Sequence, residues 1–324
     1  MYLSYKKIGF GITLAKKVWF SIPVPFLFRS IIGYQLRRMC CIARNSVCAE
    51  CMFNASCIYG QTYESIVPKN NIALMGRDRI SHPIIIDADN FAGKTLDSLL
   101  LSIIFLGTTI PYFPYFYYAL IKGGEAGITR DRVPFKVSDI VEFKASGKKR
   151  SLMINEQKLE TKIEPDRWEY NPEPAALTGM ERDSHAEMET GSKKRYKITL
   201  QSPLRFKAQG LYVSRLVDAE LARCFHRRTQ VLCSQYGHND HSGEYTFSGG
   251  WTVVEQNLKW LNFTHYSARQ KKAMQLGGLL GDFALSGNFS PYECSILQFA
   301  EKFHGGKNTN FGLGKLKVSE YGRV

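Results

Sequence analysis

Residues 303–318, FHGGKNTNFGLGKLKV, decide how the rest of the sequence is interpreted. Four glycines and three lysines surround a polar tip, and an alternating strand pattern follows at residues 315–318. Glycines let backbone N–H groups approach a phosphate closely, and lysines supply the charge that a phosphate requires. The spacing fits neither a nucleotide-binding P-loop, which needs glycine where Thr309 stands, nor the dinucleotide pattern G-x-G-x-x-G. The stretch therefore predicts a phosphate-binding loop, with a flexible surface loop as the alternative.

A faint copy of this region lies near the middle of the chain. Gly123-Gly124 precedes the sequence KVSD at residues 136–139, and Gly305-Gly306 precedes KVSE at residues 317–320. Each glycine pair follows an apolar stretch of helical length. Such self-similarity indicates a duplicated structural unit.

The charge of the 324-residue chain is uneven. It has 43 Lys and Arg against 29 Asp and Glu, a net charge of +14, yet residues 160–191 hold nine of the acids and only three of the bases. The remainder therefore carries 40 bases and 20 acids, and no acid precedes Glu50. A basic body with an acidic insert indicates a polyanionic partner, nucleic acid first and an anionic membrane second, with basicity for solubility alone as the alternative.

The periodicity of apolar residues predicts the same order of elements twice. In the first half the predicted elements are a strand at 2–14, a helix at 26–44, strands at 82–89 and 96–106, a helix at 111–123 and a strand at 133–143. In the second half they are a strand at 196–200, a helix at 213–236, strands at 251–263 and 274–285, a helix at 291–303 and a strand at 315–318. The order β-α-β-β-α-β defines the ferredoxin-like, or RRM-like, unit. The sequence thus predicts an α+β fold of two tandem ferredoxin-like domains with a glycine-rich C-terminal loop.

The predicted domain boundaries follow from this order. Residues 1–145 form the N-terminal domain, residues 146–194 an acidic insert or linker, and residues 195–324 the C-terminal domain. The insert contains three prolines and few aliphatic residues in its second half. This composition predicts a mobile loop or a short hairpin.

Several stretches resemble the CRISPR precursor-RNA processing endoribonucleases of the repeat-associated mysterious protein (RAMP) superfamily. The matching stretches are YSARQ (266–270), LGGLLG (276–281), HGGKNTNFGLG (304–314), the first-domain glycine segment 123–135, and the run Cys41, Cys48, Cys51, Cys57 followed by Tyr59 and Glu64. The resemblance covers most of the chain except residues 146–194, and its last segment is the most specific. It implies two ferredoxin-like domains and metal-independent cleavage of CRISPR repeat RNA.

In that reaction a deprotonated 2′-hydroxyl attacks the scissile phosphate, cations stabilise the phosphate, and the 5′ leaving oxygen is protonated. The products are a cyclic phosphate and a 5′-hydroxyl. The chemistry needs a group of near-neutral pKa and a fixed positive charge, but no metal. Many members of the family carry the working histidine on the first helix, whereas this chain has no histidine before His82. The acid/base group therefore lies elsewhere, or a tyrosine or lysine replaces it, or the protein binds RNA without cutting it.

The candidate site residues fall into two groups. Candidates for catalysis are His304, directly before the glycines, Tyr34 on the predicted first helix, and His265. The alternative for His304 is that it helps to bind RNA or caps the preceding helix, and the alternative for His265 is a structural role at the end of a strand. The residues predicted to bind RNA are Arg269, Gly305, Gly306, Lys307, Asn308, Gly312, Gly314, Arg37 and Arg38.

The cysteine run raises the question of a metal. Only the central Cys48 and Cys51 have the C-x-x-C spacing of a zinc half-site, so Cys41, Cys48, Cys51 and Cys57 suggest a structural zinc, with buried free thiols as the alternative. No cofactor is expected in catalysis. Eight cysteines without an export signal indicate a reducing cytoplasm.

These observations favour a CRISPR-RNA processing endoribonuclease that acts in antiviral defence, with repeat RNA and guide RNA as its partners. The alternative is a non-cleaving guide-RNA-binding subunit that contacts other subunits of a CRISPR effector complex. A peripheral-membrane protein is the weakest interpretation, and no membrane partner is expected.

Overall fold

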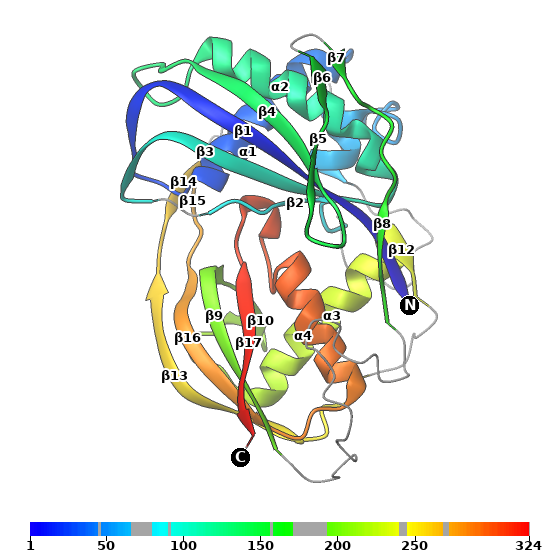
Figure 1. Ribbon diagram of the computed structural model, residues 1–324, viewed down its shortest axis with the longest axis vertical. Helices are drawn as coiled ribbons and strands as arrows, with labels where there is room; N and C mark the ends of the chain where they lie inside the picture. The colour runs from blue at the N-terminus through cyan, green and yellow to red at the C-terminus, as the bar shows by residue number, and fades with distance from the viewer. Residues whose placement is uncertain are drawn as a thin grey trace.

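The structure is a computed structural model, and it describes residues 1–44, 47–65, 80–89, 92–155, 158–170, 193–239, 245–267 and 272–323. Two sheets with their helices lie one above the other, with the N-terminal unit uppermost in Figure 1. Among the described residues, no helix combines the length and the apolar character needed to cross a membrane.

The N-terminal unit has the expected order of elements. They are β1 (Tyr2–Phe20), α1 (Val24–Cys40), β2 (Ile84–Ile86), β3 (Lys94–Leu106), α2 (Phe113–Ala126) and β4 (Phe135–Phe143). The strand order β2-β3-β1-β4 is antiparallel throughout and places β1 at the centre, as a ferredoxin-like unit requires. Helices α1 and α2 bury their apolar faces against this sheet in one core. A π-helical turn, η1 (Gly60–Glu64), and a 3-10 turn, η3 (Gly107–Tyr112), complete the unit.

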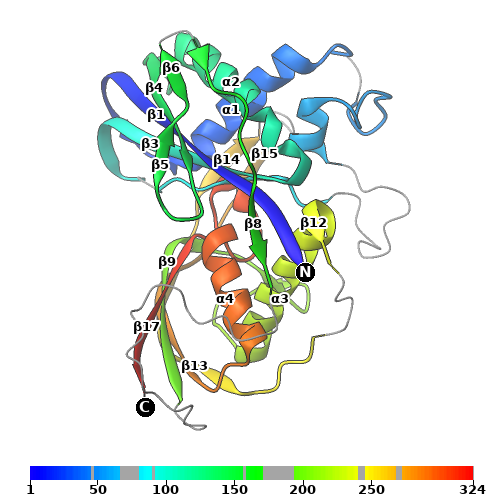
Figure 2. The same ribbon diagram turned by 45° about the vertical axis from the view of Figure 1, so that its right-hand side comes forward.

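The C-terminal unit repeats this arrangement. Its elements are β9 (Lys194–Leu204), α3 (Asp218–Tyr236), β13 (Trp251–Leu261), β16 (Gly278–Gly287), α4 (Pro291–Phe303) and β17 (Leu316–Arg323). The strand order β13-β16-β9-β17 again centres on the first strand of the unit. Figure 2 shows α3 and α4 side by side on one face of the curved sheet. The α+β fold with two tandem ferredoxin-like domains is confirmed.

Shorter elements surround these two units. They are β5 (Lys149–Ser151), β6 (Met153–Asn155), β7 (Lys158–Leu159), β8 (Asp166–Glu169), β10 (Lys207–Ala208), β11 (Leu211–Tyr212), β12 (Gly237–His238), β14 (Thr264–Ser267), β15 (Lys272–Gln275) and the 3-10 turn η4 (Thr309–Phe311). Strand β5 extends the first sheet next to β4, and β8 pairs with the start of β1. The second half of the predicted insert, residues 171–192, lies outside the described residues, so its predicted mobility stays a prediction.

Several predicted boundaries are wrong. Strand β1 ends at Phe20 rather than at residue 14, α1 ends at Cys40 rather than at residue 44, and β17 ends at Arg323 rather than at residue 318. The predicted strand 274–285 is two strands, because β15 pairs with β14 whereas β16 pairs with β9 and β13. Helix α3 begins at Asp218 rather than at residue 213, and the Asp218 carboxylate accepts a hydrogen bond from Val253 N at 2.7 Å. Helix α2 continues past Gly123 to Ala126.

The glycines in the last turn of α2 serve close packing rather than an end to the helix. A Cβ on Gly123 would lie 2.3 Å from Ile31 Cγ2, and one on Gly124 would lie 2.1 Å from Phe135 O. Both glycines therefore let α2 approach α1 and β4. The two glycine pairs of the sequence repeat thus differ in place, because Gly123 and Gly124 lie within α2 whereas Gly305 and Gly306 follow the end of α4.

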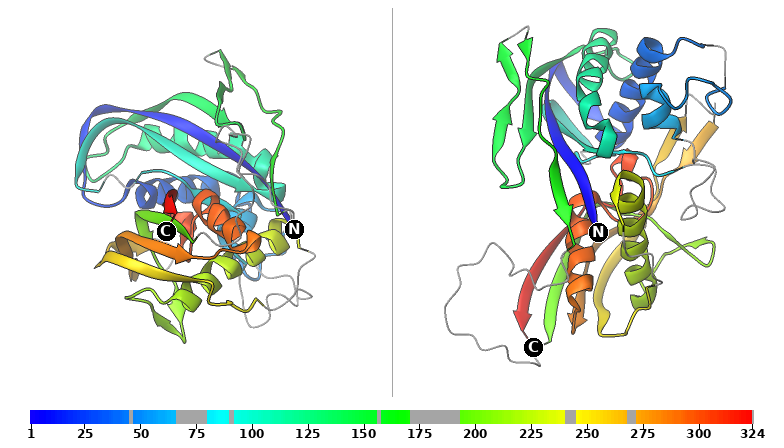
Figure 3. Two further views of the ribbon diagram at one scale, coloured as in Figure 1. Left: turned by 60° about the horizontal axis from the view of Figure 1, so that its bottom comes forward. Right: turned by 90° about the vertical axis from the view of Figure 1, so that its right-hand side faces the viewer.

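The two units share buried contacts. The first residues of strand β1 pair with β12, which directly follows the end of α3. Tyr5 packs edge-on against Phe303 at 5.0 Å between ring centroids, within a core that also holds residues of α3 and β3. Figure 3 shows the N-terminus beside α3 and α4 and the C-terminus at the far end of the second sheet.

Candidate functional site: a basic cleft at the glycine-rich loop

A cleft of about 1330 Å³ lies where the two units meet. Its walls come from α1, from the segment around η1 and residues 80–82, from α3, and from the glycine-rich loop after α4. Its basic lining residues are Arg29, Arg37, Arg38, Arg44, Lys207, Arg223, Arg227, Arg228 and Lys307. Positive side chains from both domains thus converge on the loop that the sequence singled out.

Helix α1 provides the basic wall on the N-terminal side. Arg29, Gly33 and Arg37 are four residues apart and therefore lie on one face of the helix. A Cβ on Gly33 would lie 2.6 Å from the Tyr63 ring, so glycine lets this ring pack against the helix. Tyr63 stacks on Tyr59 with 5.5 Å between ring centroids, and burial raises the pKa of Tyr63 above its usual range. This wall combines cationic heads with a fixed aromatic stack.

Arg29 connects this wall to the glycine-rich loop. Its guanidinium lies 4.0 Å from the centroid of the Phe311 ring. When the Asn310 amide is oriented so that its oxygen faces its donors, that oxygen accepts hydrogen bonds from Arg29 Nε and Nη2 at 3.0 Å and from His82 Nε2 at 3.2 Å. Residues of the first domain therefore hold the tip of a loop that belongs to the second.

The backbone of the loop is fixed by its own hydrogen bonds. Gly305 N donates to Gly314 O at 2.8 Å, Gly314 N donates to Pro203 O at 2.9 Å, and Lys307 N donates to Arg205 O at 2.7 Å. The φ angles of Gly306, Gly312 and Gly314 are 73°, 77° and 75°, a region that favours glycine. Residues 306–311 line the cleft. Gly305, Gly312 and Gly314 are not part of the cleft lining, but their backbone fixes the shape of the loop.

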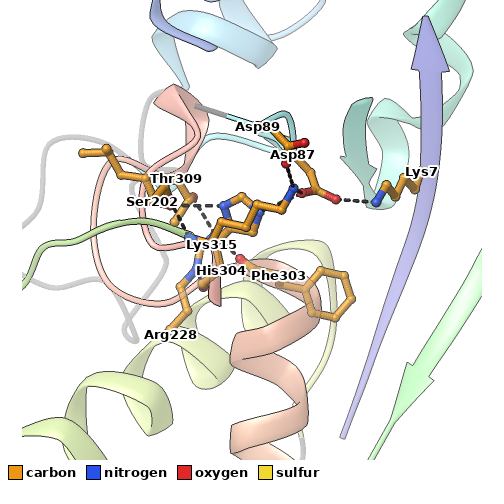
Figure 4. Close-up of polar contacts among 10 residues, drawn as sticks. Lys7, Asp87, Asp89, Ser202, Arg228, Phe303, His304, Thr309 and Lys315 are labelled. Carbon is orange, nitrogen blue, oxygen red and sulfur yellow. Dashed lines mark hydrogen bonds and ion pairs between the residues drawn. The ribbon is translucent and has the colours of Figure 1, made fainter. Parts of the chain in front are cut away.

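His304 is not among the residues that line the cleft, and its ring points toward Asp87 (Figure 4). It is 1% exposed, with Nδ1 3.1 Å from Leu313 O and Nε2 3.4 Å from Asp87 Oδ1. Asp87, which follows β2, also pairs with Lys7 of β1 and, at 3.0 Å, with Lys315. Burial alone would raise the pKa of Asp87, but the hydrogen bond and charge of His304, with Lys7 and Lys315, lower it well below its usual range. This network joins the two domains.

His265 of β14, by contrast, lines the cleft. Its ring packs edge-on against Phe26 at 5.9 Å and Phe311 at 5.2 Å between centroids. Burial, and then the charge of Arg29, lower the pKa of His265 below its ordinary value of 6.5. The imidazole is therefore neutral at pH 7 and can accept a proton.

The other predicted site residues lie as follows. Tyr34 and Arg38 are exposed and Arg37 is half-buried, and all three line the cleft beside the loop residues Lys307 and Asn308. Arg269 lies outside the described residues, and its predicted role stays a prediction. Sequence analysis missed Arg29, Tyr63 and His82. The four-residue spacing of Arg29, Gly33 and Arg37 was a usable signal, whereas nothing local pointed to Tyr63 or His82.

The cysteine run lies next to the cleft. Cys41 is part of its lining, and Cys57 Sγ is 4.0 Å from Cys40 O. All four cysteines of the predicted zinc site are free thiols. Within the described ranges, no three His, Cys, Asp or Glu side chains come together as a metal site. The structural zinc therefore rests on spacing alone and stays a prediction.

Replacing Gly314 by alanine should destabilise the protein by about 2 kcal/mol or more, because a left-handed φ and a clash act together. A Cβ there would lie 1.9 Å from Gly305 O, whereas a Cβ on Gly210, whose φ of 83° is equally left-handed, would meet nothing within 4 Å. Gly210→Ala thus isolates the cost of the φ angle. Urea unfolding of both variants checks this, and equal losses would show that the clash is relieved.

Many solved structures share this fold. The chain is 12% identical to the "Partial Cas6-RT-Cas1--Cas2 complex" (TM-score 0.55), with 98% of this chain and 46% of that one covered. It is also 12% identical to the "Cas6-RT-Cas1--Cas2 complex" (TM-score 0.55), with 98% and 29% covered. Thermus thermophilus Cas6 is 10% identical (TM-score 0.50), with 98% and 99% covered. The chain thus spans less than half the length of the first two.

The fold and the loop define an α+β protein of two ferredoxin-like domains with a glycine-rich loop at a basic cleft. A family model described as "CRISPR-associated endoribonuclease Cas6" matches residues 198–316, and one described as "N-terminal domain" matches residues 8–166. No curated protein matches the chain in sequence. Over residues 198–316 the chain is therefore similar to the CRISPR-associated endoribonuclease Cas6 family.

Proposed function

We propose that the protein binds CRISPR repeat RNA in the cleft and cleaves the precursor once per repeat without a metal ion. The observation that carries the proposal is the convergence of basic side chains from both domains on the glycine-rich loop, with a neutral histidine in the same cleft. RNA and further CRISPR proteins are the proposed partners, and antiviral defence in the cytoplasm is the proposed setting.

The proposed reaction assigns roles to groups in the cleft. His265 accepts the proton of the attacking 2′-hydroxyl, whose oxygen then bonds to phosphorus while the bond from phosphorus to the 5′ oxygen breaks. Arg29, Arg37 and Lys307 stabilise the negative charge on the phosphate. Tyr34, which is 60% exposed at the rim, is the proposed donor of the proton to the 5′ oxygen. The products are a 2′,3′-cyclic phosphate and a 5′-hydroxyl.

The test is cleavage of the cognate repeat RNA in EDTA, next to the same RNA with a 2′-deoxy residue at the cut position. We expect the first RNA to be cut and the second to stay intact while it still binds. Loss of cleavage in EDTA would contradict the metal-free mechanism. Tight binding without cutting of either RNA would favour the second candidate, a guide-RNA-binding subunit, for which the burial of His304 already speaks.

Binding should weaken steeply with salt, because each phosphate contact releases counterions. For a single strand the slope of log K against log[salt] is about −0.7 for each contact. Arg37→Gln should reduce the magnitude of the slope by about 0.7, whereas the same change at Lys317, an exposed residue outside the cleft lining, should leave it unchanged. Titration of the deoxy RNA from low to high salt measures the slope, and an unaltered slope in Arg37→Gln would remove that residue from the phosphate contacts.

A further inference from the structure

Arg228 differs from the other basic residues of the cleft. It lies on α3, where its neighbours Arg223 and Arg227 are exposed, yet its own side chain is buried, with 8% of its surface accessible. It is nevertheless part of the cleft lining, like both neighbours. Arg228 is therefore buried and yet faces the cleft in which a ligand of the loop would bind.

The guanidinium of Arg228 donates hydrogen bonds to the start of the loop and to its tip (Figure 4). Its Nη2 donates to Phe303 O at 3.2 Å and to Thr309 Oγ1 at 2.7 Å, and its Nε donates to His304 O at 3.3 Å. Phe303 ends α4 and Thr309 begins η4. One planar side chain thus fixes the start of the loop relative to its tip, a geometry that a lysine ammonium does not reproduce.

All three acceptors are neutral. No carboxylate pairs with Arg228 among the residues that the structure describes. Burial lowers the pKa of Arg228 to about 10, so the side chain remains charged at neutral pH. A buried charge is costly unless an opposite charge lies beside it.

The opposite side of the same loop is arranged differently. There His304 and Lys315 share the carboxylate of Asp87 with Lys7, and Lys315 also pairs with Asp89 at 3.0 Å. The protein thus neutralises the cations behind the loop with its own carboxylates. On the cleft side, no carboxylate of the described residues balances the charge of Arg228.

We propose that Arg228 is a positioning residue that holds the glycine-rich loop in shape and whose charge is balanced by a phosphate bound against residues 306–309. The inference rests on the proposed function for the carrier of that phosphate, which is the RNA backbone. The phosphate site itself can be tested without RNA.

The first measurement is thermal unfolding of the intact chain in inorganic phosphate and in sodium chloride of equal ionic strength. Phosphate should raise the Tm of the wild type more than chloride does, since a ligand that binds only the folded state stabilises it. Arg228→Met should lose this increment, Arg228→Lys should keep part of it, and Lys317→Met, at an exposed residue outside the cleft lining, should keep all of it. A purely structural role would lower the Tm in both salts and leave the increment intact, and that result would overturn the proposal.

The second measurement separates this inference from the proposed function. Arg228→Lys keeps the charge and is the variant to rely on if Arg228→Met does not fold. Its affinity for the deoxy repeat RNA should fall on the order of tenfold, since three hydrogen bonds to the loop are disturbed. Wild-type affinity together with a full phosphate increment would overturn the positioning role. If the wild type cuts no RNA but its phosphate increment depends on Arg228, the proposed function fails and the phosphate site stands.

Discussion

Replacing His265 by alanine should lower the single-turnover rate of RNA cleavage by about 10²- to 10⁴-fold while RNA affinity changes little. The reason is that a positioned proton acceptor acts mainly in the transition state, whereas the arginines and Lys307 are the proposed contacts for RNA binding. Rapid-quench cleavage of repeat RNA under enzyme excess separates the two effects. His238→Ala is the matched control, because that histidine is exposed on β12 outside the cleft lining.

The dependence of the cleavage rate on pH should show in which protonation state His265 acts. In the proposed reaction His265 acts as a base in its neutral form, and burial and the charge of Arg29 hold its pKa below 6.5. Cleavage should therefore be level near pH 7 and fall as the pH falls through the pKa of His265. Arg29→Gln removes a positive neighbour, so the descending limb should move to higher pH. A wild-type rate in His265→Ala would reassign the base, and Tyr34→Phe would be the next variant.

The two candidate histidines show what the sequence could and could not reveal. Both stand next to motifs of the resembled family, and no periodicity distinguishes them. Their roles differ because His304, with a φ of 60°, leads out of α4 toward Asp87, whereas His265 sits on a strand that faces α1. The direction of a side chain at a helix end depends on which long-range partner is available. Asp87 lies 217 residues before His304 in the chain, so only the folded structure brings them together.

The fold was easier to predict than the site. Alternating and helical periodicities are local signals. Helix α4 has its expected bounds because Ser290 and Glu293 form a capping box at its start and Pro291 occupies its first position. A glycine was wrongly predicted to end a helix where it serves close packing, as at Gly123. Residues of irregular segments such as Tyr63 and His82 reach the cleft through tertiary contacts, which periodicity does not encode.

Asp87→Asn should destabilise the protein by about 3 kcal/mol, because it removes the carboxylate shared by the partly exposed Lys7 and Lys315 and by the buried His304 ring. Asp87 is 9% exposed and contacts Lys7, His304 and Lys315, which come from both domains. Asp89→Asn is the matched control: the Asp89 side chain is 63% exposed and pairs with Lys315, so a loss of about 1 kcal/mol or less is expected. Urea unfolding at pH 7 measures both variants.

Acid titration adds an independent check on the same network. Because the folded-state pKa of Asp87 is lowered well below 3.8, its contribution is fully present above that value and is lost as the pH falls through the folded pKa. The wild type should therefore lose stability in this acidic range, and Asp87→Asn should lose less, because it has no carboxylate there to protonate. His304→Ala in the Asp87→Asn background should cost less than in the wild type, since the two side chains interact. Additive losses would show that Asp87 stabilises the interface through Lys7 and Lys315 alone, and the burial of His304 would then owe nothing to this carboxylate.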